Sequence, residues 1–414
     1  MPPLAEDAAP QPVPPWLDGF LDAHLDELVA FRRRLHAHPE VSWAEVETTA
    51  AVIGRLRVAG LSPSQLPEST GLATGTASSF EAPSDGRPVV ALRADLDALA
   101  MEDEKDVAYR STLPGVAHAC GHDVHTTVVL GAALALAEAV KEGELTGAFR
   151  FIFEPAEEAL PGGAPSVIDA GALGGVSSML GVHCDPKIDV GQVALRTGPI
   201  TSAADMARIT ILGPGGHTAR PELTVNLLAV LGQVLSQVPE RVAKAAAPAE
   251  VLVVFGSTHG GDAPNVIPTR ATATATIRTP DVEAWEHAAE LLEQATRAVV
   301  EPTGATLEFA YRKGVPPSVN AAAPTRSLRR AAASVVGEHN TVEAQHSRGG
   351  DSFAWYARQV PASYARLGTF NPASGAPRPD IHSGAFDVDE RSIGIGVRLL
   401  VGAALAERDR LASG

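Results

Sequence analysis

Cysteine, basic residues and long apolar runs are all scarce in this chain. Two cysteines, Cys120 and Cys184, are too few for a disulfide framework. The 33 lysines and arginines are outnumbered by 49 aspartates and glutamates, and the net charge of -16 argues against the basic surface that nucleic-acid binding requires. No uninterrupted apolar run reaches the roughly 18 residues of a membrane-spanning helix. The first residues lack the basic start and apolar stretch of a signal peptide, so we expect a cytoplasmic protein with no membrane partner.

What the chain does have is the composition and length of a globular protein with more than one core. Hydrophobic residues make up 45% and charged residues 20% of the sequence, and the mean hydropathy is +0.05. Single hydrophobic cores stop growing at about 250–300 residues. Because this chain has 414 residues, we expect two domains.

Strands and helices alternate in the first part of the chain. A proline-rich lead-in over residues 1–15 is followed by apolar patterns that predict helices over 16–35, 48–58 and 126–140 and strands over 89–93 and 148–153. Both strands run into acidic residues at their carboxyl ends, where open α/β sheets bind ligands. This alternation is typical of an α/β fold with a mainly parallel sheet covered on both faces.

The pattern changes at about Ser202. Strands are predicted over 207–212, 251–256 and 271–277, and helices over 223–237 and 282–300. Two helices and a small sheet indicate an inserted α+β domain. Gly314, Pro316 and Pro317 mark the return of the chain. We therefore predict a catalytic domain made of residues 16–201 and 312–414, with an insert over 202–311.

A Cys-x-His pair precedes the apolar helix predicted over 126–140. Gly121 lets the backbone turn tightly between Cys120 and His122, so that a thiolate and an imidazole can reach one metal ion. Taken alone, His122 is more often a hydrogen-bonded structural histidine. His125 can serve as a further ligand by helical spacing, although a supporting position behind the ligands suits it better.

Two adjacent carboxylates, Glu157 and Glu158, follow the strand predicted over 148–153. Neighbouring side chains of an extended segment point in different directions, so one glutamate can bind a metal ion while the other faces a water molecule as general base. Burying both at one strand end requires a positive ion beside them. A glutamate pair on a solvated loop is the plain alternative.

Two further histidines complete a donor set that is distributed over four segments. His183 ends the apolar run 176–182, and His382 lies far downstream in the segment 380–387. Neither is diagnostic alone, but one cysteine, three histidines and one or two glutamates supply about five ligands, enough for two borderline-soft divalent ions that share a water. Asp95, just past the strand predicted over 89–93, either orients one of these ligands or caps a helix.

The order and spacing of these motifs resemble the aminoacylase, hippurate hydrolase and auxin-conjugate hydrolase branch of the dinuclear metal carboxypeptidase family. The resemblance covers nearly the whole chain and is carried by residues 31–36, 93–99, 118–125, 155–158, 183, 215–217, 265–268 and 382–390. The chain departs from the family pattern at Ala100, Ala159, Gly384 and residues 351–353, and the last of these changes bears on substrate choice.

The resemblance implies a role for each matching residue. Two divalent ions, zinc or manganese in the first place and cobalt or nickel in the second, would be bound by Cys120, His122, Glu158, His183 and His382, with Glu157 as general base. The insert would be the lid and dimerisation domain of a homodimer. In it, His217 would stabilise the oxyanion in the active site of the partner subunit, and Asn265 and Arg278 would hold the substrate. Without the resemblance, His217 is better explained as a turn histidine.

The activity that we expect is metal-dependent hydrolysis of the amide bond of N-acyl amino acids or similar small conjugates. Glu157 would take a proton from water and return it to the leaving nitrogen. A dipeptidase differs from this only in its substrate. A cysteine hydrolase built on Cys120 leaves the glutamate pair, His183 and His382 unexplained, and a non-catalytic metal- or ligand-binding relative has no need of Glu157.

Overall fold

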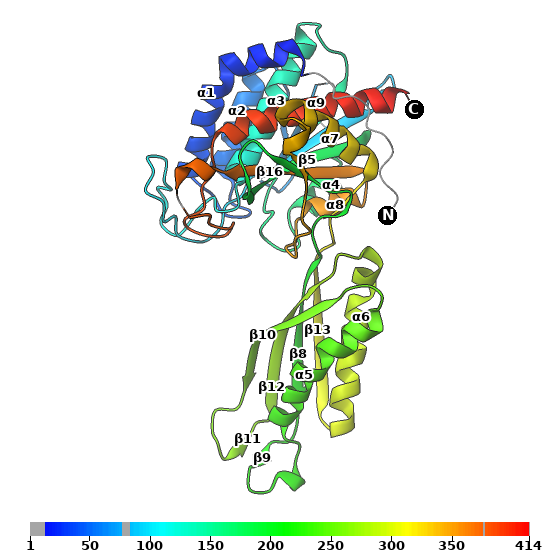
Figure 1. Ribbon diagram of the computed structural model, residues 1–414. Helices are drawn as coiled ribbons and strands as arrows, with labels where there is room; N and C mark the ends of the chain where they lie inside the picture. Colours follow the sequence, from blue (N-terminus) through cyan, green and yellow to red (C-terminus); the bar gives the residue numbers. More distant parts are fainter. Residues whose placement is uncertain (1–12, 77–82, 376, 414) are drawn as a thin grey trace. The chain divides into compact units, whose positions relative to one another are not determined.

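The computed structural model describes residues 13–76, 83–375 and 377–413, and the chain divides into two compact units (Figure 1). The first unit contains the chain up to Gly198, Val319–Gln345 and the residues from Trp355 onward, and the second contains Pro199–Ser318 and His346–Ala354. The second unit is therefore larger than the predicted insert 202–311. Most of the predicted lead-in, residues 1–12, lies outside the described residues.

An eight-stranded sheet forms the centre of the first unit, in the order β1-β2-β4-β3-β5-β16-β6-β15. Its strands are β1 (Ser64–Gln65), β2 (Leu72–Gly75), β3 (Val89–Asp95), β4 (Ala148–Glu154), β5 (Val176–Asp189), β6 (Val193–Leu195), β15 (Thr341–Glu343) and β16 (Ala362–Phe370). The four central strands, β4, β3, β5 and β16, are parallel to one another. Every residue of β3 and β4 is buried, so both faces of these strands are covered. The predicted α/β fold with a mainly parallel sheet is confirmed.

Helices α1 (Pro15–Ala37), α2 (Val46–Val58), α3 (His122–Lys141), α4 (Ala164–Asp169), α7 (Ala322–Val336) and α9 (Arg391–Ser413) belong to the first unit. Helices α1, α3, α9 and α7 contact one another in succession, and α3, α9 and α7 also contact the central strands (Figure 1). Apolar spacing in α1 buries Leu17, Leu21 and Leu28 against this core.

Helix α3 is the most buried helix of the first unit. By length and composition α3 is apolar enough to cross a membrane. However, 89% of its most apolar 18-residue stretch is buried inside the structure, as in the core helix of a globular domain. It begins at His122 rather than at the predicted residue 126. The reason is Gly121, whose φ of 90° places it in the left-handed region and turns the chain directly into the helix. His122 and His125 therefore share the first helical turn.

The second unit is an antiparallel four-stranded sheet in the order β10-β12-β8-β13, with two helices packed on it. Its elements are β8 (Ala204–Leu212), β9 (Gly216–His217), α5 (Leu227–Ala246), β10 (Leu252–Gly260), β11 (Val266–Ile267), β12 (Arg270–Arg278), α6 (Val282–Val300) and β13 (Thr306–Val315). Strand β12 alternates buried Ala or Ile with partly exposed Thr, and the buried side chains pack with those of α5 and α6. The unit thus has the α+β composition expected of the insert.

Helix α5 and strand β13 show where the sequence prediction for the second unit was incomplete. Helix α5 begins at Leu227 rather than 223, because Pro221–Leu223 forms a separate 3-10 turn and Asn226 accepts a hydrogen bond from the backbone N–H of Ala229 as the N-cap. Strand β13 (Thr306–Val315) was not predicted, and it runs past residue 311, where the insert was expected to end; the Gly314 N–H donates to Asp205. Three elements, β7 (Gly198–Pro199), β14 (Val319–Asn320) and α8 (Phe353–Ala357), lie where the chain passes between the units.

Candidate active site

The candidate site lies at the carboxyl ends of the central strands. Asp95, the last residue of β3, pairs with Glu154, the last residue of β4, so both strands end at one edge of the sheet. Strand β5 runs parallel on the other side of β3, with Gly181 opposite Arg93, and it carries His183 past the same edge. This edge is where open parallel sheets place their ligand sites.

Three of the predicted metal ligands form a compact group. The ligand atoms of Cys120, His122 and Glu158 all lie within 4.8 Å of one another. The His122 Nδ1–H donates to the main-chain oxygen of Asp97 at 2.9 Å, which leaves Nε2 with its lone pair toward the group. In the described part of the chain this buried Nε2 has no hydrogen-bond partner, and it lies 3.9 Å from a carboxylate oxygen of each of Glu157 and Glu158.

The other two predicted ligands reach the same group from different sides. His183 Nε2 lies 3.7 Å from the Cys120 sulfur, and its Nδ1–H donates to the main-chain oxygen of Cys184 at 2.7 Å. His382 Nε2 lies 3.1 Å from Glu158 Oε1. The His382 backbone has a φ of 61° and donates its N–H to the Ala119 oxygen at 2.7 Å, which fixes it beside the Cys120 segment. All five side chains that the sequence nominated therefore converge.

The segment that carries Glu157 and Glu158 is held through its backbone. Asp97 accepts the Glu157 N–H on Oδ1 at 3.0 Å and the Glu158 N–H on Oδ2 at 3.1 Å. Glu45 accepts the preceding N–H, that of Ala156, at 2.7 Å. Neither Asp97 nor Glu45 was predicted from the sequence to have a role in the site. A second acid two residues after Asp95, at the same strand end, was a usable signal for Asp97, whereas Glu45 had no comparable signal.

Asp95 and His125 form a supporting pair. His125 Nδ1 lies 2.7 Å from Asp95 Oδ1, and His125 Nε2 accepts the Cys184 N–H at 2.8 Å, so both ring nitrogens are occupied. The second oxygen of Asp95 accepts from Arg93 at 2.7 Å and lies 3.8 Å from His122 Nε2. His125 is thereby placed behind the ligand group, and the side chain of Asp95 orients His125 rather than capping a helix.

The electrostatics of the group suit a cation. Burial lowers the pKa of His183 well below its usual value, which keeps its imidazole in the neutral, ligating form. Burial, together with the charge of Glu158, raises the pKa of the Cys120 thiol well above its usual value. Burial also opposes protonation of His122, but the charge of Asp95 outweighs it and raises the His122 pKa. The raised His122 pKa reflects the negative charge of the nearby carboxylates, which a metal ion would balance. The thiol, imidazole and carboxylate donors fit borderline divalent ions.

A family model described as Peptidase family M20/M25/M40 matches residues 91–406. The chain belongs to this family. The "Probable hydrolase sll0100" of Synechocystis is 37% identical over 382 residues, covering 92% of this chain and 95% of the relative. The N-acetylcysteine deacetylase of Bacillus subtilis is 34% identical over 367 residues (88% and 93%), and the IAA-amino acid hydrolase ILR1-like 4 of Arabidopsis thaliana 35% over 379 residues (90% and 84%). The predicted resemblance is confirmed, and this member of the family is a hydrolase.

Solved structures agree with this assignment. The Bacillus subtilis YXEP protein, described as a dinuclear metal binding peptidase from the M20 family, has a TM-score of 0.78 and 30% identity, covering 93% of this chain and 98% of that one.

A Rhodococcus jostii protein named as a glutamate–cysteine ligase is 41% identical over 382 residues, or 91% of this chain, but the chain spans only 46% of that longer protein. The ligase name therefore carries nothing over to this member of the M20 family.

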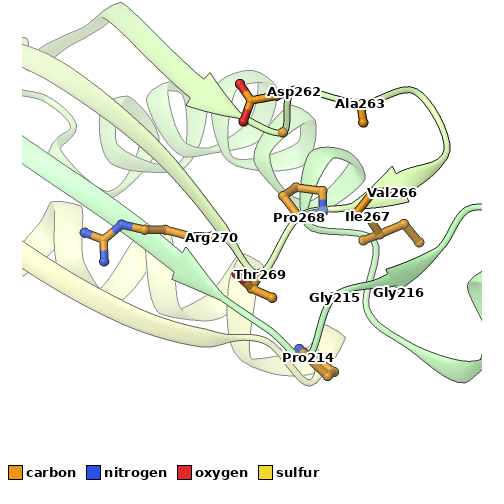
Figure 2. Close-up of a pocket in the computed structure, with 11 residues that line it drawn as sticks. Pro214, Gly215, Gly216, Asp262, Ala263, Val266, Ile267, Pro268, Thr269 and Arg270 are labelled. Carbon is orange, nitrogen blue, oxygen red and sulfur yellow. The ribbon is translucent and has the colours of Figure 1, made fainter.

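The second unit of this M20-family chain carries His217 in the short strand β9. Strand β9 pairs with β11, and the Thr218 N–H donates to the Asn265 oxygen, so His217 and Asn265 lie at one end of the unit. The exposed His217 accepts the Ala219 N–H on Nδ1 at 3.0 Å, so in the neutral ring Nε2 carries the proton and is a donor. Figure 2 shows the residues that line a hollow beside β9 and β11, several of them glycine and proline. The volume of this hollow is about 470 Å³.

Arg278 lies at the opposite end of the second unit. Arg270, at the start of β12, lines the hollow beside β9 and β11 (Figure 2). Arg278 is the last residue of the same nine-residue strand, which at ~3.4 Å per residue puts it about 27 Å further on. It is partly buried and donates to the Arg348 main-chain oxygen at 3.3 Å. Within one chain, the structure does not bring Arg278 together with His217 and Asn265.

Proposed function

We propose that this M20-family chain hydrolyses the amide bond of N-acyl amino acids or similar small conjugates. The observation that carries the proposal is the convergence of Cys120, His122, Glu158, His183 and His382 into one group at the sheet edge, beside Glu157. Two relatives are named for N-acetylcysteine and for IAA-amino acids, both of them conjugates of an amino acid. These names support the substrate class.

The five converging side chains would hold two divalent ions. Such ions polarise an amide carbonyl and lower the pKa of water when they are bound. Cysteine and histidine ligands suit zinc, while the carboxylate admits manganese, with cobalt and nickel as further candidates. The YXEP protein, a dinuclear relative, supports the number of ions.

Glu157 would act as the general base and then as the acid. Its carboxylate lies beside the ligand group, with Oε2 3.9 Å from His122 Nε2, and its side chain is 12% exposed. From this position it can accept the proton of the attacking water and deliver it to the leaving nitrogen. The adjacent Glu158 lies equally close to His122 Nε2 and also 3.1 Å from His382 Nε2, and its place between two histidines supports a separate task as a metal ligand.

The second unit would be a lid and dimerisation domain that completes the partner's site. His217 Nε2–H is an exposed donor suited to an oxyanion, and Asn265 lies beside it. Arg278 is about 27 Å along β12 from Arg270, at the other end of the unit, which is too far for one small substrate to contact both ends. If all three residues hold the same substrate, His217 and Asn265 must come from one chain and Arg278 from the other. A symmetric homodimer meets this condition.

The rival functions fit the site less well. A nucleophilic cysteine needs a lowered pKa and some exposure, whereas Cys120 is buried beside Glu158 and its pKa is raised. A purely metal-binding relative leaves Glu157 without a task. A dipeptidase would use the same site and remains the second candidate, supported by the peptidase description of YXEP. The predicted cytoplasmic location stays a prediction.

The test combines metal analysis with a substrate panel. Purified, remetallated protein would be assayed on N-acetyl, N-benzoyl and longer-chain acyl amino acids, and in parallel on dipeptides. We expect close to two divalent ions per chain, hydrolysis of at least one acyl amino acid, and loss of activity with a chelator that added metal restores. Full activity in metal-free protein, or cleavage of dipeptides alone, would overturn the proposal.

A further inference from the structure

The segment before Glu157 adopts a backbone conformation that its sequence does not favour. Ala156 has a φ of 52°, in the left-handed region where a side chain with a Cβ is disfavoured. Such a conformation persists only where the surroundings hold it in place. Ala156 is fully buried and directly precedes Glu157 and Glu158, so its conformation sets the direction in which the two carboxylates leave the strand end.

Pro155 is fixed by close backbone packing on two sides. A Cβ added to Gly71 would come within 2.6 Å of Pro155 Cδ, and one added to Gly163 within 1.9 Å of the Pro155 oxygen. Only glycine permits such approaches. The chain entering Ala156 is therefore held by neighbouring backbone, and the remaining freedom lies in the peptide that carries the Ala156 N–H.

Glu45 holds that peptide. Its side chain is fully buried, Oε1 accepts the Ala156 N–H at 2.7 Å, and Oε2 accepts the hydroxyl of Thr70, the residue before Gly71. A carboxylate is costly to bury, and here both of its oxygens are used on the two segments that enclose Pro155. Capping helix α2 does not require it, because Glu40 accepts the N–H groups of Glu47 and Thr48 at that helix start.

We propose that Glu45 is a positioning residue that aims Glu157 by holding Ala156 in its left-handed conformation. The inference rests on the role proposed above for Glu157. With Glu45 and Asp97 together, the backbone N–H groups of three consecutive residues, 156–158, are bound by two carboxylates from elsewhere in the chain. Removing the Glu45 contact frees the peptide next to the base while the Asp97 contacts remain.

Glu45→Ala and Glu45→Asp test the proposal, with Glu45→Gln and Glu40→Ala as matched controls. A displacement of the base by about 1 Å lowers turnover by up to ~10²-fold, so we expect kcat to fall about 10- to 100-fold in Glu45→Ala, with KM within about threefold. Glu45→Asp keeps the charge but has a shorter side chain, so its kcat should fall by less than that of Glu45→Ala. This variant replaces Glu45→Ala in the test if the alanine variant fails to fold. Glu45→Gln keeps an oxygen for the Ala156 N–H and should retain most of the turnover. Glu40→Ala should lower the Tm without lowering kcat.

Two further measurements separate positioning from a general loss of stability. Amide hydrogen exchange of Ala156 should be faster in Glu45→Ala or Glu45→Asp and unchanged in Glu40→Ala, independently of activity. In a Glu157→Gln background, Glu45→Ala should lower the residual rate by less than about twofold, because the base it positions is already absent.

The outcomes distinguish this inference from the proposed function. If Glu157→Gln turns over normally, the role of Glu157 is wrong. If Glu157→Gln is inactive while folded Glu45→Ala and Glu45→Asp keep wild-type kcat and Ala156 exchange, only the positioning role of Glu45 is wrong. A loss in Glu45→Ala that is equally large with and without Glu157 also overturns the positioning role.

Discussion

Arg32 donates from Nε to Asp123 Oδ2 at 2.7 Å, and each of these side chains is 1% exposed. The pair joins α1 to the first turn of α3, where Asp123 follows the predicted ligand His122. The same guanidinium lies 3.3 Å from Asp387, in the segment after His382. Burial raises the pKa of Asp123, but the charges of Arg32 and His36 outweigh it and hold this pKa well below its usual value. A single buried cation thus joins two segments that carry predicted metal ligands.

Replacing Arg32 by Met should destabilise the protein strongly. The change leaves the Asp123 carboxylate buried without its cation, which typically costs about 3–5 kcal/mol. Arg33→Met is the matched control, because Arg33 is 50% exposed and its pair with Glu390 should contribute about 0–1 kcal/mol. Denaturant unfolding of both variants checks the difference. Equal losses of unfolding free energy in the two variants would mean that the buried Arg32–Asp123 pair contributes no more than the exposed Arg33–Glu390 pair.

Glu157→Gln and Glu158→Gln should have different effects although the residues are adjacent. Glu157→Gln keeps the shape of the side chain and loses the base, so we expect normal metal content and a turnover about 10²- to 10⁴-fold lower. Glu158→Gln loses a charged ligand and should bind less metal. Turnover at saturating substrate and elemental analysis of both proteins check this. Equal metal content in both variants would contradict the separate tasks assigned to the pair.

Glu407 should contribute to the stability of the first unit in a pH-dependent way. It is fully buried on α9 and accepts hydrogen bonds from Arg410 at 2.6 Å and Ser327 at 2.6 Å. Burial raises its pKa, but these bonds outweigh the burial and lower it from the usual 4.5. Because the unfolded chain binds more protons in this range, the contribution is complete above about pH 4.5 and is lost as the pH falls through the depressed value.

Measuring Tm between about pH 3 and 7 tests the Glu407 prediction. Glu407→Gln should have a lower Tm at neutral pH and a shallower decline in acid, because the group that takes up the proton is gone. Glu142→Gln, at an exposed glutamate that ends α3, should follow the wild-type curve. Parallel curves for wild type and Glu407→Gln would show that Glu407 does not carry this pH dependence.

The fold could be predicted where the pattern and the end signals lie close together in sequence. Helix α6 was predicted over 282–300 and is observed at Val282–Val300, since its apolar spacing is unbroken and Asp281 supplies a side-chain N-cap. The start of α3 was predicted four residues late. The local signal there was a left-handed Gly121, which the apolar pattern does not reveal. In the same way, the pairing of residues 346–354 with the second unit depends on contacts between distant segments.

The residues of the candidate site could likewise be predicted only in part. The nominated ligands are residue types with a limited range of uses, so their motifs identified them before any geometry was known. Glu45 and Asp97 act through backbone N–H groups. Glu45 contacts a residue 111 positions away in the sequence, so neither its residue type nor its spacing from the ligands indicates its role. The supporting role of His125 was decided by one hydrogen bond from the Cys184 N–H. Sequence patterns identify donors to a metal better than they identify what holds those donors in place.

The final prediction concerns His217 and the proposed active site shared between two chains. Because His217 and Arg278 lie at opposite ends of one second unit, we expect each active site to use Glu157 of one chain and His217 of the other. His217→Ala should lower kcat by about 10²- to 10³-fold without loss of metal, as the removal of an oxyanion donor typically does.

Mixing His217→Ala chains with Glu157→Gln chains then gives heterodimers with one intact site and one doubly defective site. With equal amounts and random exchange, half the dimers are mixed, so activity should return to about a quarter of the wild-type value. If exchange is verified and no activity returns, His217 serves its own chain or none, and the shared site is wrong.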